Sequence, residues 1–219
     1  MSSAEFFQQH TKLTRSLKKF IQDYEATLDE SVFAAFLESL TQELENIKTD
    51  LFKAPAGPAR ARKLHALVEE EIEKGADIKI NCQKGCSACC HMEVEITNNE
   101  ADILAELIKN GHAIDRQKLQ QQSAYSLQDK KWKESMNNQT NKCVFLNQEG
   151  ACSIYESRPV MCRRHSVTSP AINCTDINAI VTLRYFPRVD LLISAANEDP
   201  QLQIGPLAKM LELRLATGI

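Results

Sequence analysis

Four cysteines lie within nine residues, and their spacing is suited to holding a metal ion. Cys82, Cys86 and Cys89 stand four and three positions apart, and Cys90 follows directly. The deprotonated thiol is the form that binds metal, and this spacing lets successive sulfurs converge on one ion. Gly85 allows the tight turn that such convergence needs. The segment therefore predicts a metal site.

The adjacent pair Cys89 and Cys90 bears on the number of ions. Side chains of neighbouring residues tend to point apart, so the two sulfurs fit poorly on one tetrahedral ion. The pair could serve two different ions, or one thiol could stay outside the coordination sphere. The spacing leaves both arrangements open.

Four further cysteines follow in polar, turn-rich surroundings that argue against a buried apolar role. They are Cys143, Cys152, Cys162 and Cys174. Residues 143–146 and 152–155 flank a four-residue polar loop, which predicts a β-hairpin. Because a cysteine begins each arm, the hairpin would bring two thiols toward a shared neighbour.

The bulk composition is that of an ordinary globular protein. The chain has 219 residues, of which 43% are hydrophobic and 25% charged. Its net charge of -3 argues against a nucleic-acid partner, because neutralising phosphates requires a basic surface. No apolar run approaches the length of about 20 residues that a membrane-spanning helix needs, so we expect no membrane partner.

The cellular compartment decides how eight cysteines are interpreted. The first ten residues lack the basic and apolar regions of a secretory signal, which predicts a cytoplasmic protein. Thiols are kept reduced in the cytoplasm, so the even cysteine count indicates metal ligation or redox chemistry rather than disulfides.

Basic residues near the cysteines could offset the negative charge that several thiolates leave around a divalent ion. They are Arg158, Arg163, Arg164 and Lys84, and a solvated surface position is the alternative interpretation for each. His91 or His165 could instead be the base for a catalytic cysteine. A nucleophile does not need seven further cysteines, so metal binding is favoured.

Helical periodicity dominates the chain and predicts a mainly α fold: a helical bundle with a short β-hairpin and cysteine-rich loops that form a metal centre. Capping boxes begin at Ser2 and Thr97, and Pro58 suits the first turn of a helix. The expected helices cover residues 2–28, 33–51, 58–75, 97–110, 115–137, 176–183 and 206–216, with a short strand at 93–97.

This pattern predicts two regions. Residues 1–77 would form an N-terminal helical region, and residues 78–219 a cysteine-cluster metal-binding domain with C-terminal helices. The apolar seam over residues 33–51 is typical of a helical hairpin and could also support a homodimer.

The cysteine motifs, taken in order, resemble a known family. Cys82-x3-Cys86-x2-Cys89-Cys90, Cys143-x-Phe145-Leu146 and Gly150-x-Cys152 through Arg158-Pro159-x-x-Cys162-Arg163 are similar to the YkgJ-type cysteine-cluster family, also called the CxxCxxCC family. The resemblance covers about residues 80–175 and implies a domain that chelates zinc or iron. It carries over to Cys86, Cys89, Cys90, Cys143, Cys152 and Cys162, with Cys82 and Cys174 as the remaining pair. Members often have an aromatic residue after the Cys-Arg pair. Here Arg164-His165-Ser166 follows, so His165 could be an accessory ligand or an acid–base group.

Two functions follow from these residues. The first is a metal-binding protein that holds zinc or iron through cysteine thiolates, and eight thiols would suffice for two sites of four. The second is an iron-sulfur protein, since four cysteines suit a cluster equally well.

The spacing of Cys82, Cys86 and Cys89 also matches the cluster motif of radical-SAM enzymes, which gives the second function a redox or SAM-dependent enzymatic form. A methylation-related role has a similar basis, because related cysteine clusters occur in proteins that look like flagellin lysine methylases. The absence of alternating strand and helix units argues against the usual partial barrel. The sequence leaves open whether the protein is an enzyme.

Overall fold

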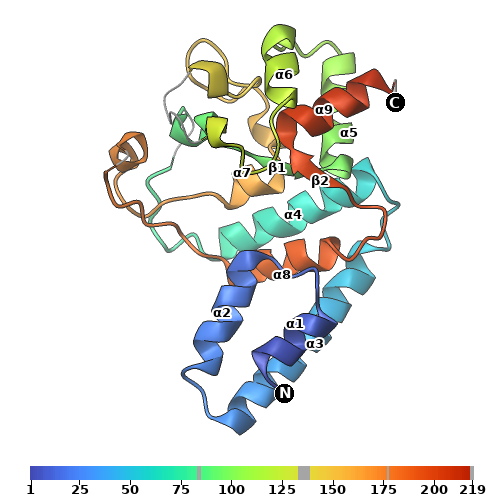
Figure 1. Cartoon of the computed structure of the whole chain (residues 1–219), viewed down its shortest axis with the longest axis vertical. Coiled ribbons are helices and arrows are strands. Elements are labelled where there is room, and N and C mark those ends of the chain that lie inside the picture. Colours follow the sequence, from blue (N-terminus) through green and yellow to red (C-terminus); the bar gives the residue numbers. More distant parts are fainter. Residues whose placement is uncertain (83–84, 133–138, 177, 218–219) are drawn as a thin grey trace. The chain divides into compact units, whose positions relative to one another are not determined.

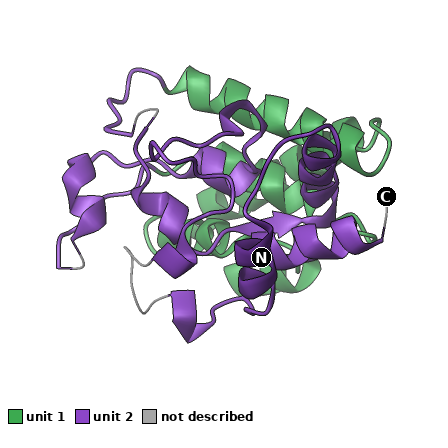
Figure 2. Cartoon of the chain, turned by 90° about the horizontal axis from the view of Figure 1, so that it is seen from above, with its two compact units in different colours: residues 1–75, 185–202 green, residues 76–184, 203–219 purple. Residues whose placement is uncertain are grey.

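The computed structural model describes residues 1–82, 85–132, 139–176 and 178–217, and it divides into two compact units (Figures 1 and 2). The first unit combines residues 1–75 with 185–202, and the second combines residues 76–184 with 203–219. All eight cysteines lie in the second unit. The mainly α fold class is confirmed.

The first unit is helical throughout its regular elements. It contains α1 (Ser3–Gln9), α2 (Arg15–Glu25), α3 (Glu30–Leu51), α4 (Pro58–Lys74) and α8 (Pro187–Ala196). Helix α8 packs against α2, α3 and α4. Leu37, Leu51 and Val68 are fully buried between them, so the apolar stripes read from the sequence do form a core.

The N-terminal segment corrects one sequence-based expectation. The single helix predicted over residues 2–28 is divided into α1 and α2. The break has a local cause, because the Thr14 hydroxyl accepts a hydrogen bond from the Leu17 amide at 3.2 Å and caps a new helix. The predicted helices over 33–51 and 58–75 are confirmed as α3 and α4, the latter with Pro58 in its first turn.

The second unit combines short helices with a small sheet. Its longer elements are β1 (Glu95–Thr97), α5 (Asn98–Lys109), α6 (Arg116–Ser123), α7 (Val160–Arg164), β2 (Ile204–Pro206) and α9 (Leu207–Ala216). Strands β1 and β2 are antiparallel, with Ile96 opposite Gly205. Figure 1 shows α9 beside α5 and α6, and these helices enclose a core that includes Leu104, Phe145 and Leu211.

Three elements predicted for this unit differ in the structure. The hairpin at 143–155 is reduced to one antiparallel bridge, between Leu146 and Cys152, and the two-stranded sheet is made by β1 and β2 instead. The polar helix expected over 115–137 ends at Ser123, because its apolar anchors are too sparse to bury a longer stretch. Residues 133–138 of that prediction lie outside the described residues.

The helix predicted over 176–183 does not form in the part of this segment that the structure describes. The short 3-10 helix η5 (Ala171–Thr175) precedes it, and Thr168 donates its amide hydrogen to the Thr182 carbonyl at 2.9 Å. This bond and the bridge between Val167 and Leu183 hold residues 182 and 183 against the segment 167–168, which is a strand-like pairing and not a helix. Residue 177 lies outside the described residues.

A buried carboxylate joins two of the elements that support the cysteines. Glu100 is only 4% exposed, and its side chain completes the capping box at the start of α5. Its Oε2 accepts from the Thr97 amide at 2.9 Å, and its Oε1 accepts from the Val160 amide at 2.8 Å. Glu100 therefore fixes the start of α7, the helix that carries Cys162.

No helix in the described residues is both long and apolar enough to cross a membrane.

Replacing Glu100 tests this link. Glu100→Ala should lower the free energy of unfolding by about 2–3 kcal/mol, because buried amides of two segments lose a charged acceptor. Glu106→Ala, at an exposed position of the same helix, should change it by less than about 0.5 kcal/mol. Urea unfolding of both variants under reducing conditions measures the difference, and equal values would contradict the assigned role.

Candidate metal centre

The 3-10 helix η1 (Ala88–His91) carries the two adjacent cysteines. Gly85, just before it, has a φ of 93°, which bears out its predicted use in a tight turn. The Cys90 amide donates to the Ser87 carbonyl at 2.9 Å and closes the helical turn. The Cys89 and Cys90 thiols are hydrogen-bonded to each other. The expectation that the two side chains diverge is therefore wrong.

The first cysteine segment meets the second through its backbone. The Cys143 amide donates to the Cys90 carbonyl at 2.7 Å, and η1 contacts the 3-10 helix η3 (Gln139–Asn141). Residues more than fifty positions apart are thus neighbours, as the order of motifs in the sequence requires.

A polar turn positions Cys143 and Cys152. The Asn147 amide donates to the Ala151 carbonyl at 2.9 Å, and the Ser153 amide donates to the Phe145 carbonyl at 2.8 Å. Phe145 is 1% exposed, and both cysteines pack against the core that contains it. The turn is thereby anchored on one side by apolar packing.

Helix α7 brings a further thiol to the same region. Its Cys162 amide donates to the Pro159 carbonyl at 2.9 Å, and Glu100 holds the first residue of the helix. Five thiols interact electrostatically in this region, and we refer to them as the inner thiol group: Cys89, Cys90, Cys143, Cys152 and Cys162.

Burial and mutual repulsion keep most of the inner thiols protonated in the absence of metal. Burial raises the pKa of Cys143 to about 11 and that of Cys162 well above its usual value. The charges of Cys89 and Cys152 raise both further. The hydrogen bond from Cys90 lowers the pKa of Cys89 to about 7, and it raises the pKa of Cys90. Cys89 is therefore the member of the pair that ionises first.

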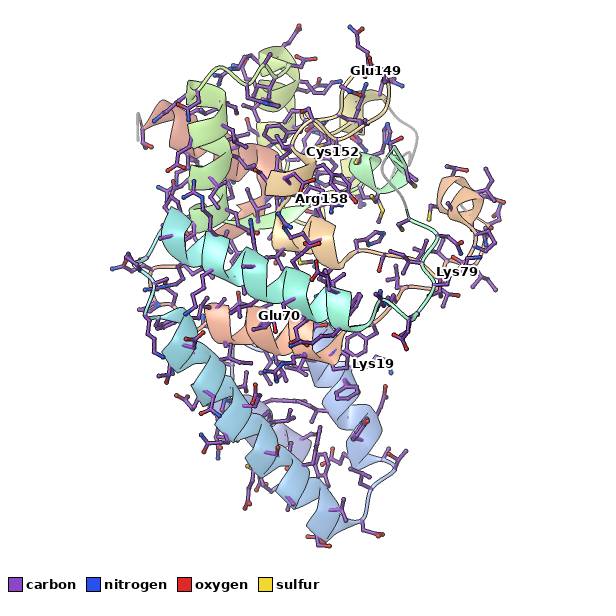
Figure 3. The ribbon with its side chains drawn as sticks, turned by 180° about the vertical axis from the view of Figure 1, so that it is seen from behind. Lys19, Glu70, Lys79, Glu149, Cys152 and Arg158 are labelled. Carbon is purple, nitrogen blue, oxygen red and sulfur yellow. The ribbon has the colours of Figure 1, made fainter. Side chains whose placement is uncertain are left out.

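Arg158 opposes this repulsion at three of the inner thiols, and Lys118 does so at Cys143. The Arg158 charge lowers the pKa of Cys89, Cys152 and Cys162. Figure 3 shows Arg158 near Cys152. Its Nε donates to the Tyr155 carbonyl at 2.8 Å, and its guanidinium lies 3.5 Å from the centre of the Tyr155 ring. These contacts fix the guanidinium where it can stabilise thiolates.

The remaining cysteines form a second set, which we call the outer thiol group: Cys82, Cys86 and Cys174. The Cys82 sulfur accepts the Val167 amide at 3.3 Å. Burial raises the pKa of Cys82 and of Cys174, and the charges of Cys86 and Cys89 raise both further. Helix η5, which carries Cys174, contacts η1. Cys89 is thus the inner thiol whose charge also affects the outer group.

Other candidate residues have different roles. Arg163 donates to the backbone carbonyls of Arg158 and Glu156 and supports the segment before α7. Burial raises the pKa of Glu95, and the charge of Arg164 offsets part of that rise. Burial and the Arg164 charge lower the pKa of His165, which favours the neutral imidazole. Lys84 lies outside the described residues.

The positions of His91 and of the thiols bear on how a metal ion could be held. His91 Nδ1 lies 3.2 Å from the Ser87 carbonyl oxygen, within its own turn. As the side chains stand, no three His, Cys, Asp or Glu side chains of the described chain form a set that could hold one ion. Metal binding would therefore require the thiols to change position. The donor set, soft thiols opposed by an arginine, fits a thiophilic metal.

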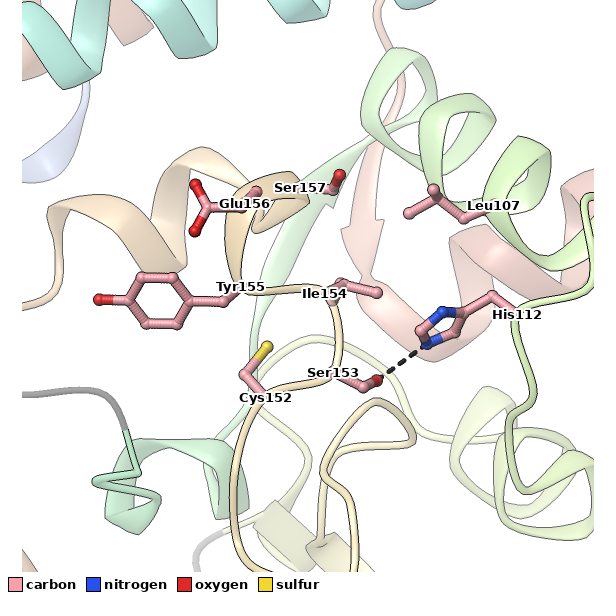
Figure 4. Close-up of a pocket in the computed structure, with 8 residues that line it drawn as sticks. All are labelled: Leu107, His112, Cys152, Ser153, Ile154, Tyr155, Glu156 and Ser157. Carbon is pink, nitrogen blue, oxygen red and sulfur yellow. Dashed lines mark hydrogen bonds between the residues drawn. The ribbon is translucent and has the colours of Figure 1, made fainter.

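A cavity of about 270 Å³ lies beside the Cys152 segment (Figure 4). His112 Nε2 lies 2.9 Å from Ser153 Oγ, and this hydroxyl also donates to the Phe145 carbonyl at 2.9 Å. The Cys152 sulfur and the Ser153 hydroxyl leave the chain in different directions (Figure 4). The pair of His112 and Ser153 therefore supports the turn that carries Cys152.

Two supporting residues could not be identified from the sequence. The side-chain amide of Asn81 donates to the Thr168 and Ser169 carbonyls at 2.8 and 3.1 Å and holds the segment before Cys82. Its position next to a cysteine was the only signal. Glu100 appeared as a capping residue, but nothing in the sequence indicated its bond to Val160.

The second unit is therefore a helical unit with a thiol-rich site. Residues 81–181 match the family model named CxxCxxCC, described as a "putative zinc- or iron-chelating domain". The match confirms the family resemblance and covers all eight cysteines. It supports metal binding in general terms. No curated protein and no solved structure matches the chain significantly.

Changing Arg158 tests its electrostatic role. Arg158→Gln should raise the pKa of the nearby thiols, so zinc retention should require a higher pH and zinc affinity at neutral pH should fall about tenfold. Arg158→Lys should lie between this variant and the unchanged chain, because it keeps the charge and loses the planar contact with Tyr155.

The measurement is competition with a chromophoric zinc chelator across pH. Arg116→Gln, at an exposed arginine of α6, is the control for net charge. Equal losses in Arg158→Gln and Arg116→Gln would contradict a local effect.

Proposed function

We propose that this protein binds zinc or iron through cysteine thiolates, and that its ligands come from Cys82, Cys86, Cys89, Cys90, Cys143, Cys152, Cys162 and Cys174. The observation that carries the proposal is the inner thiol group: thiols from three separate segments gather around η1, opposed by Arg158. The match to a zinc- or iron-chelating domain supports the same conclusion.

The electrostatics of the site favour metal as the partner of these thiols. Ionising buried sulfurs that also repel one another is unfavourable, and burial and the charges of neighbouring thiols raise the pKa values of Cys143 and Cys162. A divalent cation removes this cost, because it replaces the thiol protons and binds the thiolates together. We propose that the metal completes the structure of this region.

Zinc or iron in closed thiolate coordination suits the arrangement best. Structural zinc takes four ligands, and the inner group offers at least that number. Cys143 and Cys152 pack against the apolar core, which limits the access of water and substrate to this side of the centre.

An iron-sulfur cluster is the second candidate, since the spacing of Cys82, Cys86 and Cys89 suits one. A radical-SAM enzyme would need a partial barrel of parallel strands. In the part of the chain that is described, the one sheet is a pair of antiparallel strands. We therefore propose binding or redox roles ahead of SAM-dependent catalysis, in the cytoplasm, where thiols stay reduced.

Metal analysis of anaerobically purified protein, together with its optical spectrum, tests the proposal. Stoichiometric zinc and a colourless protein are the expected result for the zinc form. A brown protein absorbing near about 400 nm would identify a thiolate-ligated cluster instead. Protein that stays metal-free after incubation with zinc and with ferrous iron under reducing conditions would refute both candidates.

A further inference from the structure

Residues 166–168 are the central one of three strand-like segments in the second unit. On one side, the Asn81 amide donates to the Val167 carbonyl at 2.9 Å, and the Cys82 sulfur accepts the Val167 amide at 3.3 Å. On the other side, Val167 lies opposite Leu183 in an antiparallel bridge. The segment that contains Leu183 is therefore the outer segment on that side.

The hydrogen bonds of this bridge fix the direction in which the outer segment presents its backbone. The Thr168 amide donates to the Thr182 carbonyl at 2.9 Å. The Arg184 amide donates to the Ser166 carbonyl, also at 2.9 Å. In this antiparallel pattern the residue between the two bonds turns its own N–H and C=O away from the neighbouring segment. The backbone groups of Leu183 therefore point outward.

Val181 shares this outward direction. The Thr182 amide donates to Ser169 Oγ at 3.1 Å, so both backbone groups of Thr182 bond inward. The direction alternates along a strand, which turns the N–H and C=O of Val181 outward. Within the described chain, no hydrogen bond reaches the backbone of Val181 or Leu183. Four unpaired backbone groups thus form an open strand edge.

The side chains of this edge are apolar and accessible. Ile180, Val181 and Leu183 are 83%, 36% and 57% exposed. Residues 178–183 contain no charged residue and no proline. Proteins commonly protect an exposed edge with lysine, proline or a bulge, because an unprotected edge pairs readily with another strand. This edge is therefore suited to pairing.

The edge is also complementary to itself. A two-fold axis at Thr182 would place Val181 of one copy opposite Leu183 of a second copy, and Leu183 opposite Val181. Each of these pairs would exchange two N–H···O bonds, so the pairing would satisfy all four outward groups of each copy. The two Thr182 residues would face each other, which is a favourable cross-strand pair. No like charges would oppose one another across residues 181–183.

We propose that this edge joins two copies of the chain as an antiparallel dimer, with Val181 of each copy paired with Leu183 of the other. None of the paired residues is a candidate metal ligand, so the proposal is independent of the proposed metal-binding function. The paired segment is short, and interfaces smaller than about 1,200 Å² bind weakly. The dimer should therefore form reversibly.

Sedimentation velocity of the full, reduced chain from about 10 μM to about 1 mM tests the dimer, since this range covers weak association. The unchanged chain should shift from monomer to dimer as its concentration rises. Leu183→Lys should raise the dissociation constant by at least about tenfold, because it puts a charge on the edge. Ile78→Lys is the matched control: Ile78 is 49% exposed, and it precedes Asn81 on the other side of the central segment.

Amide hydrogen exchange at low and high concentration tests the pairing itself. The amides of Val181 and Leu183 should exchange more slowly at high concentration, because they would gain acceptors only in the dimer. The amides of Thr182 and Arg184 are already bonded within the chain, so their exchange rates should not change.

Circular dichroism checks that Leu183→Lys keeps its helices, and if it does not, amide exchange in the unchanged chain decides the matter. Equal weakening in Leu183→Lys and Ile78→Lys would overturn the proposal. A dimer without slower exchange at Val181 and Leu183 would do so too. A chain that stays monomeric at about 1 mM would also overturn it, and the edge would then fit an extended segment of a different protein.

Discussion

The burial of several thiols in one region is the constraint on which this site depends. Four chain segments deliver thiols to the region around η1, and burial, together with the charges of neighbouring sulfurs, makes these thiols harder to ionise. Arg158 offsets part of this charge, and the hydrogen bond between Cys89 and Cys90 lets one thiol of the pair ionise near neutral pH. In the proposed function a bound cation would replace the thiol protons. Metal binding and the local fold would then be linked, because the same ion would hold together the loops that carry the thiols.

The supports of the site explain why it can exist in a unit with so little regular structure. Glu100 holds the start of α7, Asn81 holds the segment before Cys82, and Phe145 anchors the turn between Cys143 and Cys152. Glu100 and Asn81 act through hydrogen bonds to backbone groups, and Phe145 acts through apolar packing. The thiols thus lie on short, irregular segments, several of which are held in place by such contacts.

The sequence predicted the parts of the structure whose determinants are local. Capping boxes at Ser2 and Thr97 and the proline at the start of α4 all form as expected. The errors arise where long-range contacts decide. The segment after Cys174 pairs with residues 166–168 instead of forming a helix. The strand predicted at 93–97 forms as β1, but its partner β2, more than one hundred residues later, was not predicted.

The candidate site also has parts that could be predicted from the sequence and parts that could not. The residue types and spacing made all eight cysteines candidate ligands and Arg158 one of four candidate cations, because soft ligands and compensating charges are recognisable from chemistry alone. That the cysteines hold metal stays a prediction. Their division into inner and outer groups could not be predicted, because it depends on how η1, η5 and α7 pack. The contact between the Cys89 and Cys90 thiols was likewise not predictable, since it follows from the 3-10 turn that carries them.

X-ray absorption at the edge of the bound metal tests thiolate coordination most directly. For the zinc-loaded, reduced protein we expect four sulfur neighbours per ion at about 2.3 Å. Nearest neighbours that are mainly nitrogen or oxygen at about 2.0–2.1 Å would contradict the central claim that the cysteines hold the metal.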